Sequence, residues 1–131
     1  MTVKKRILIV DDEPGIGKVL RIEFSLSGYD VTTTTSGAEA IELIRAQEPD
    51  VVLLDVIMPD VTGMDVLNEV RTFSQVPIIV FTGHAEMGRS ALKIGANDYI
   101  TKPFNHELLM DKVKSVLSAG KSMKRRGANK E

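Results

Sequence analysis

The chain has 131 residues, of which 43% are hydrophobic and 27% are charged, with a formal net charge of −1. This size and balance suit one globular domain with its own core, and the absence of cysteine excludes disulfides, thiol catalysis and cysteine-ligated metal sites. The N-terminal apolar run is too short for a signal peptide and no stretch could span a membrane, so we expect a cytoplasmic protein.

Five short segments are typical of β-strands. Three are apolar runs, as expected for strands covered on both faces. Another is β-branched but polar, which suits the edge of a sheet, and the last is very short. In chain order the segments are Ile7–Val10, Val31–Thr35, Val51–Leu54, Ile78–Phe81 and Tyr99–Ile100.

The segments between these strands predict five helices. Pro14 stands where the first helix should begin, and Gly28 and Gly95 stand just past two helix ends. The fourth helix, Ala85–Ile94, has the weakest pattern. The other four have apolar stripes at helical spacing: Ile16, Val19, Leu20 and Phe24; Ala38, Ile41 and Ile44 or Arg45; Val66, Leu67, Val70 and Phe73; Leu109, Val113, Val116 and Leu117.

Alternation of strands and helices predicts an α/β fold, a doubly wound parallel sheet with helices on both faces. We expect this domain to cover residues 1–119 and residues 120–131 to form a basic C-terminal tail or linker stub. Residues 119–131 contain five Lys/Arg and one Glu. Such a tail is usually a solvated terminus, and five cations would give DNA only a weak, salt-sensitive attraction.

Polar side chains follow the C-terminal ends of four predicted strands. Asp11 and Asp12 follow the first strand, Asp55 the third, Thr82 the fourth and Lys102 the fifth. Open parallel sheets bind their ligands beyond this edge. The fold therefore predicts that these five side chains converge on one site.

The three aspartates predict a metal site. Asp11, Asp12 and Asp55 placed together would repel one another and raise each other's pKa. A hard divalent cation removes this cost, and Mg²⁺ usually takes carboxylate oxygens and waters. A plainer interpretation is that Asp12 or Glu13 only caps the following helix. The register of the aspartates with Lys102 favours the metal site.

Asp55 ends the apolar run "VVLLD" on a carboxylate. It could simply end a strand, with Lys102 a surface lysine and Thr82 an ordinary strand residue. Beside a metal, however, a carboxylate is a competent nucleophile toward phosphorus and forms an aspartyl phosphate. Phosphoryl transfer mainly needs positioning and charge neutralisation, which Mg²⁺ and Lys102 would supply. The joint placement favours a phosphorylation site.

Four stretches carry a resemblance to a known family. They are "ILIVDDEPGI", "DVVLLDVIMPDVTGMDVL", "VPIIVFTGHA" and "GANDYITKPF". Over residues 4–119 the chain resembles the receiver domains of two-component response regulators. The resemblance implies a flavodoxin-like, CheY-like (βα)5 fold with strand order 2-1-3-4-5.

The resemblance also implies a reaction. A histidine kinase or histidine phosphotransfer protein would donate a phosphoryl group to Asp55. Mg²⁺ would be held by Asp11, Asp12, Asp55 and the backbone carbonyl of Ile57. Such a protein is a phosphoacceptor that assists its own phosphorylation and dephosphorylation, rather than an enzyme.

The remaining site residues would respond to the phosphate. By resemblance, Thr82 is the switch hydroxyl, Lys102 contacts the phosphate and Tyr99 is the switch aromatic residue. Gly83 and Pro103 support the site, and the family's Lys-Pro bond is typically cis, which would aim Lys102 into the site. We expect a single-domain regulator that signals to a protein partner, or to a second copy, through the last two helices and the fifth strand.

Other interpretations stay open. The chain could be a receiver-like scaffold without phosphorylation, or a fragment of a longer regulator that lacks its output domain. An FMN-binding flavodoxin or a haloacid-dehalogenase-type phosphatase shares parts of the pattern. The loop "DDEPG" is too acidic to hold a bare phosphate, however, and Ile57 stands where such phosphatases have a second Asp. The span from Thr82 to Lys102 is also short for a receiver, which predicts a clipped loop or a shortened fourth helix.

Overall fold

A computed structural model describes residues 3–129, with side chains for residues 3–119. Within these residues, five β-strands alternate with five α-helices. The strands are β1 (Arg6–Val10), β2 (Asp30–Thr34), β3 (Val51–Asp55), β4 (Ile78–Thr82) and β5 (Asp98–Thr101). The helices are α1 (Pro14–Leu26), α2 (Gly37–Gln47), α3 (Gly63–Val70), α4 (Ala85–Ile94) and α5 (His106–Asn129).

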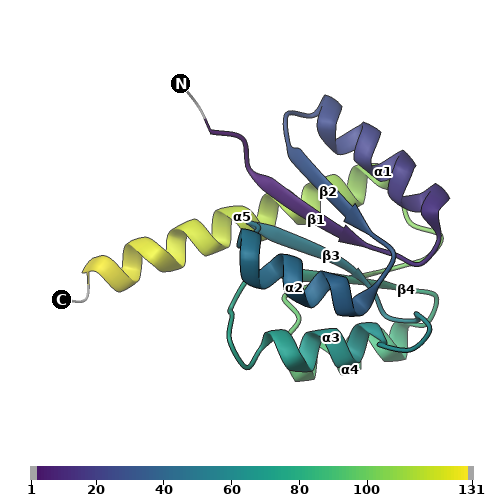
Figure 1. Cartoon of the computed structure of the whole chain (residues 1–131). Coiled ribbons are helices and arrows are strands. Elements are labelled where there is room, and N and C mark those ends of the chain that lie inside the picture. Colours follow the sequence, from purple (N-terminus) through teal and green to yellow (C-terminus); the bar gives the residue numbers. More distant parts are fainter. Residues whose placement is uncertain (1–2, 130–131) are drawn as a thin grey trace.

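The strands form a parallel sheet in the order β2-β1-β3-β4-β5, which confirms the predicted fold class and strand order. The polar, β-branched strand β2 lies at an edge, whereas the apolar strands β1, β3 and β4 lie inside. All five strands run the same way, so their C-terminal ends meet at one edge of the sheet (Figure 1).

Two hydrophobic clusters, one on each face of the sheet, form the core. Successive strand residues face opposite sides. Thus Leu8 and Val10 of β1 pack in the cluster beneath α2, α3 and α4, while Ile7 and Ile9 pack in the cluster beneath α1 and α5. Burial on both faces explains why these strands are apolar without alternation.

Three of the predicted helical stripes are partly wrong. On α1, Leu20 and Phe24 are buried as expected, but Val19 is 48% exposed and Gly17 faces the sheet instead. Glycine carries no hydrophobic signal, so the spacing of apolar residues pointed to a neighbouring face of the helix. On α2, Ala38 is exposed and Ala40 is buried in its place. Helix α3 ends before Phe73, which lies in the following turn. The strand ends differ from prediction by one residue at most.

The span from Thr82 to Lys102 contains helix α4. This helix has ten residues, and its bounds are those predicted for the weakest segment. Only Gly83 and His84 connect it to β4. The span from Thr82 to Lys102 thus contains a two-residue connection and a fourth helix of ten residues.

Helix α5 is the longest element, with 24 residues. Leu109 and Val113 are buried beneath the sheet, Val116 and Leu117 pack against the same cluster, and the C-terminal part of the helix projects past the sheet (Figure 1). The helix runs on to Asn129, but the side chains of residues 120–131 lie outside those described, so the domain limit at residue 119 stays a prediction. Within the described residues, no helix is long and apolar enough to cross a membrane.

Arg71 links two loops at the edge of the sheet opposite the polar strand ends. Its guanidinium donates to the carbonyl oxygens of Gly95 and Ser74, at 3.0 Å each, and to Oδ1 of Asn97 at 3.2 Å. Asn97 in turn accepts a hydrogen bond from the backbone of Ile78. One half-buried side chain thus holds the loop before β4 and the loop before β5 together.

We expect Arg71→Met to lower the free energy of unfolding by about 1 to 3 kcal/mol, because half-buried carbonyls lose charged donors. Urea denaturation followed by circular dichroism measures the change. Arg45→Met is the matched control, since the Arg45–Glu69 pair is exposed and spans 3.8 Å, and it should cost less than about 1 kcal/mol. Equal effects of the two substitutions would contradict this role of Arg71.

Candidate functional site

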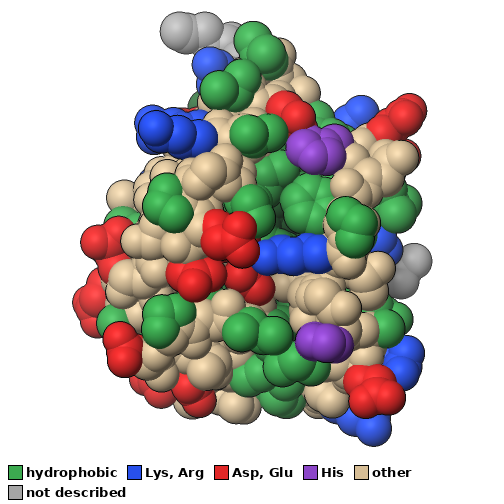
Figure 2. Space-filling view, turned by 90° about the vertical axis from the view of Figure 1, so that its right-hand side faces the viewer, with side chains coloured by type: hydrophobic (Ala, Val, Ile, Leu, Met, Phe, Trp, Pro, Cys, Tyr) green, Lys and Arg blue, Asp and Glu red, His purple; other side chains and the backbone are tan. Residues whose placement is uncertain are grey.

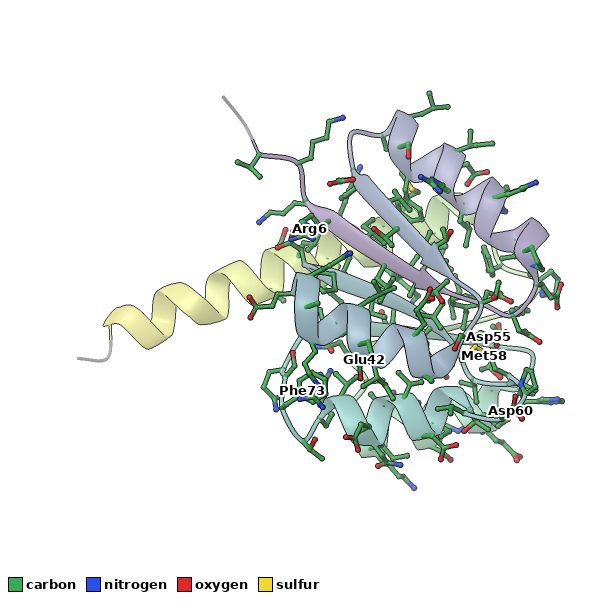
Figure 3. All side chains as sticks on the ribbon, in the orientation of Figure 1. Arg6, Glu42, Asp55, Met58, Asp60 and Phe73 are labelled. Atoms are coloured by element: carbon green, nitrogen blue, oxygen red, sulfur yellow. The ribbon has the colours of Figure 1, made fainter. Side chains whose placement is uncertain are left out.

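The predicted polar residues do converge on the C-terminal edge of the sheet. Asp11 and Asp12 follow β1, Asp55 ends β3, Thr82 ends β4 and Lys102 follows β5. Figure 2 shows this face, where acidic side chains and a long basic side chain lie side by side, bordered by hydrophobic ones. The loop after β3 begins at the same edge (Figure 3, where Asp55, Met58 and Asp60 are labelled).

Asp55 is held rigidly and almost without exposure. The four preceding residues of β3 are fully buried, and Asp55 itself is 3% exposed. Its Oδ1 accepts a hydrogen bond from the backbone of Ile57 at 3.2 Å, and its Oδ2 lies 3.3 Å from Nζ of Lys102. The apolar strand therefore presents one carboxylate, in a fixed position, at the edge of the sheet.

Asp11 is the second buried carboxylate, at 2% exposure. Its Oδ1 accepts a hydrogen bond from the backbone of Glu13 at 2.8 Å, and its Oδ2 lies 3.5 Å from Nζ of Lys102. Glu13 is the N-cap of α1, but no side chain caps this helix. The plainer interpretation, in which Asp12 or Glu13 serves as a helix cap, is therefore wrong.

Burial makes this cluster electrostatically unfavourable. Loss of solvent raises the pKa of Asp11 from 3.8 to about 6, with a further contribution from the charge of Asp55, and burial also raises the pKa of Asp55. Burial alone would lower the pKa of Lys102, but the two carboxylates outweigh it and raise that pKa. The site thus holds more negative charge than its single lysine neutralises.

The donor set suits a hard divalent cation. Asp11, Asp12 and Asp55 each offer a carboxylate oxygen, and these atoms lie within 4.8 Å of one another. Oxygen ligands from carboxylates are those that Mg²⁺ prefers, and a dication would relieve the repulsion among them. The carbonyl of Ile57 is the further predicted ligand. The backbone N–H of Ile57 donates a hydrogen bond to the Asp55 carboxylate, which fixes the turn after β3. The residues present therefore fit a magnesium ion.

Thr82 ends β4, and Lys102 directly follows the neighbouring strand β5 at the same edge. Thr82 is 1% exposed, and its hydroxyl accepts a hydrogen bond from the backbone of His84. The backbone of Lys102 donates to the carbonyl of Thr82 at 2.7 Å. The Lys102–Pro103 peptide bond is cis, as the resemblance implied. Gly83, which lies between Thr82 and His84, is exposed.

Tyr99 is the predicted residue that lies apart from the acidic cluster. It pairs with Val80 across β4 and β5, and its half-buried ring packs against the core beneath α2, α3 and α4. Strand β4, which ends at Thr82, separates the strand of Tyr99 from the strand of Asp55.

Comparison with known proteins identifies the family. The sequence matches the family described as the response regulator receiver domain over residues 7–114. The chain belongs to this family. Phosphorylation on aspartate and binding of Mg²⁺ are typical of its members.

Individual relatives agree with this assignment. The receiver is 40% identical over 119 residues to a "probable transcriptional regulator ycf27" of Guillardia theta, an alignment that covers 89% of this chain and 47% of the relative. The chain thus spans about half the length of the curated relatives it matches.

Solved structures confirm the fold. A CheY-like receiver domain protein from Methanospirillum hungatei is 30% identical and superposes with a TM-score of 0.86, over 92% of this chain and 99% of that one. NtrX from Brucella abortus is 28% identical with a TM-score of 0.88, over 98% of this chain and 30% of that one.

Sequence reasoning missed one residue of this receiver site. Gly63 begins α3 and donates a backbone hydrogen bond to Val56 at 2.9 Å, and an ideal Cβ at this position would lie only 2.1 Å from the carbonyl oxygen of Asp55. A signal was present, since Thr62 and Asp65 form a capping box that marks the start of this helix. The cap locates the helix but does not reveal how closely it approaches β3.

Proposed function

We propose that the chain accepts a phosphoryl group on Asp55 from a phosphohistidine of a histidine kinase or phosphotransfer protein. An Asp55 carboxylate oxygen would form the new bond to phosphorus while the phosphorus–nitrogen bond breaks, leaving its electron pair on the histidine ring. The observation that carries the proposal is a nearly buried carboxylate at a strand end, 3.3 Å from a lysine and clustered with two further aspartates.

The other side chains would neutralise charge. Mg²⁺, held by Asp11, Asp12, Asp55 and the carbonyl of Ile57, would supply most of the positive charge that the phosphoryl oxygens require. Lys102 already contacts two of these carboxylates, and its ammonium would move to a phosphoryl oxygen. The Thr82 hydroxyl accepts a hydrogen bond from the backbone of His84, and its own proton would be donated to a phosphoryl oxygen.

The output would be a change of surface. Phosphorylation would bias a two-state equilibrium through Thr82 and Tyr99, and a protein partner or a second copy would read the face formed by α4, β5 and α5. Histidine kinases take their phosphoryl group from ATP in the cytoplasm, so the proposed reaction places this protein in the cytoplasm. In this scheme the receiver is a phosphoacceptor and supplies only part of the catalysis of its own phosphorylation and dephosphorylation.

A second candidate is a receiver that belongs to a longer regulator. It is favoured by the lengths of the curated relatives, which are named transcriptional regulators and of which this chain covers about half. The size of the protein in extracts of its source cells, detected with an antibody against the receiver, separates the two candidates. In either candidate the phosphorylation step is the same.

Native mass spectrometry with Mg²⁺ and acetyl phosphate tests the phosphorylation. We expect the wild type to gain one phosphoryl group and Asp55→Asn to gain none. Asp60→Asn is the matched control, because Asp60 is an exposed carboxylate of the same loop with a φ of 62°, a conformation that asparagine tolerates. This variant should be phosphorylated like the wild type.

Two outcomes would overturn the proposal. One is phosphorylation of Asp55→Asn to the wild-type extent. The other is a wild type that gains no phosphoryl group and also shows no rise in melting temperature with beryllofluoride and Mg²⁺, which together mimic the acyl phosphate without any donor specificity. The same spectra report whether phosphorylation changes the oligomeric state.

A further inference from the structure

Helix α4 approaches the sheet through its smallest residues. Gly88 and Ala91, three positions apart and therefore on one face, are its buried residues. The neighbouring Met87 and Ile94 are only partly buried at the rim of the core. Because these buried residues are small, the helix backbone lies close to Tyr99 of β5.

The ring of Tyr99 occupies the space that a side chain at position 88 would need. An ideal Cβ on Gly88 would lie 2.3 Å from Cδ2, 2.6 Å from Cγ and 2.9 Å from Cε2 of Tyr99. Rotation about χ2 cannot relieve the contact with Cγ, since Cγ lies on that axis and its position is set by χ1 and the backbone. Any L side chain at position 88 therefore forces the ring to another χ1 rotamer or forces α4 away from β5.

Both proposed switch residues contact the same helix. The Thr82 hydroxyl accepts a hydrogen bond from His84, which is the N-cap of α4, and Tyr99 packs on the middle of α4 at Gly88. Thr82 and Tyr99 also lie on paired strands, where Thr101 stands opposite Thr82 and Val80 stands opposite Tyr99. A change at Thr82 can thus reach Tyr99 through a displacement of α4.

We propose that Gly88 is the positioning residue for Tyr99. Because Gly88 has no side chain, the Tyr99 ring can pack directly on the backbone of α4. The orientation of the ring then depends on the position of this helix. The structural part of this inference stands on the contact alone, while its consequence for signalling rests on the proposed function of Asp55. The expected effect of a side chain at position 88 is that the ring turns outward and no longer responds to phosphorylation.

Fluorescence tests the position of the ring. The chain has two tyrosines and no tryptophan, so in Tyr29→Phe the tyrosine emission comes from Tyr99 alone. In this background, Gly88→Ala should make Tyr99 more accessible to iodide quenching. The ratio of outward-turned to packed rings should rise about tenfold or more, because an added methyl group in a filled contact has an effect of this size. Gly15→Ala is the matched control: Gly15 is a helical glycine, and apart from the adjoining backbone of its own helix no described atom lies within 4 Å of its Cβ position.

A double-mutant cycle tests the contact itself. With Tyr99 present, Gly88→Ala should lower the urea midpoint. In the Tyr99→Ala background the same substitution should raise it, because alanine favours a helix over glycine and the clash is gone. If Gly88→Ala alone does not fold, folding of the double variant supports the proposal and failure of both overturns it. A change of the same sign and size in both backgrounds also overturns it.

The signalling arm uses acetyl phosphate and Mg²⁺ in the Tyr29→Phe background. We expect Gly88→Ala to gain the phosphoryl group on Asp55, but to lose the change in Tyr99 quenching that accompanies it in the parent. A Gly88→Ala variant with the parent's response would overturn the coupling. Should the parent gain no phosphoryl group and also fail to respond to beryllofluoride with Mg²⁺, the proposed function fails, while the quenching and the cycle still decide whether Gly88 positions Tyr99.

Discussion

Alanine at position 63 is expected to destabilise this receiver by about 3 kcal/mol or more, the upper end of what overpacking costs. The new Cβ would lie 2.1 Å from the carbonyl oxygen of Asp55 and 2.6 Å from Cα of Val56. These are backbone atoms at the end of a buried central strand, so they cannot move aside as a flexible side chain would. Relief requires α3 to lift off β3, which exposes core residues and displaces Asp55.

Urea denaturation of Gly63→Ala and Gly15→Ala provides the comparison. Gly15 is also helical, but the space around its Cβ position is open among the described residues, so alanine should stabilise there by about 0.4 to 1 kcal/mol. The two substitutions are chemically identical and should differ in sign. A Gly63→Ala protein within about 1 kcal/mol of the wild type would show that the start of α3 is not fixed against β3.

Loss of phosphorylation should accompany this loss of stability at Gly63. The backbone of Asp55 carries both the carboxylate and the turn to Ile57. A shift of even part of an ångström at this point would change the distance between Asp55 and Lys102, which is now 3.3 Å. Phosphorylation by acetyl phosphate, measured at a temperature where Gly63→Ala is still folded, should therefore be slower than in Gly15→Ala.

The sequence was sufficient to predict the acidic edge, because the position of this site depends only on the order and direction of the strands. Once β1, β3, β4 and β5 are recognised as parallel, the residues after their C-terminal ends must meet, whatever the details of packing. This is why Asp11, Asp55, Thr82 and Lys102 could be named in advance and are found together. The mixed apolar and polar runs also placed β2 correctly at the edge.

The close approaches could not be predicted in the same way. Gly63 and Gly88 matter because of atoms that are absent, and their partners, Asp55 and Tyr99, are distant in sequence. A glycine in a helical segment only lowers helix propensity in a sequence-based argument. Val19 was misplaced for a related reason, since Gly17 takes the buried position on α1 and contributes nothing to an apolar stripe.

Asp11→Asn is expected to stabilise the metal-free receiver by about 1 to 3 kcal/mol at neutral pH. The pKa of Asp11 rises from 3.8 to about 6 on folding, chiefly through burial, and each pKa unit corresponds to about 1.4 kcal/mol. Asparagine removes the buried charge and keeps an Oδ1 acceptor for the backbone N–H of Glu13. Thermal and urea unfolding in EDTA measure the gain.

The sign of the pH dependence is fixed by the direction of this shift. A carboxyl with a raised pKa is disfavoured in the folded state when it is ionised, so the advantage of Asp11→Asn should be full above about pH 6 and vanish below about pH 4. An advantage that grew as the pH fell would contradict the assignment. Exposed Asp60→Asn should show neither the gain nor this pH dependence.

Added Mg²⁺ should reverse the ranking of the two proteins. A cation that binds only the folded wild type stabilises it in proportion to the logarithm of its concentration, and Asp11→Asn removes one of the three clustered carboxylates. Asp12→Asn should lose the response to Mg²⁺ as well, but its gain in EDTA should be smaller, since Asp12 is less buried than Asp11. Opposite effects of one substitution with and without the cation would mean that the carboxylate is retained for binding, at the expense of stability. If Mg²⁺ left the wild-type melting temperature unchanged, the acidic cluster would have to serve another purpose.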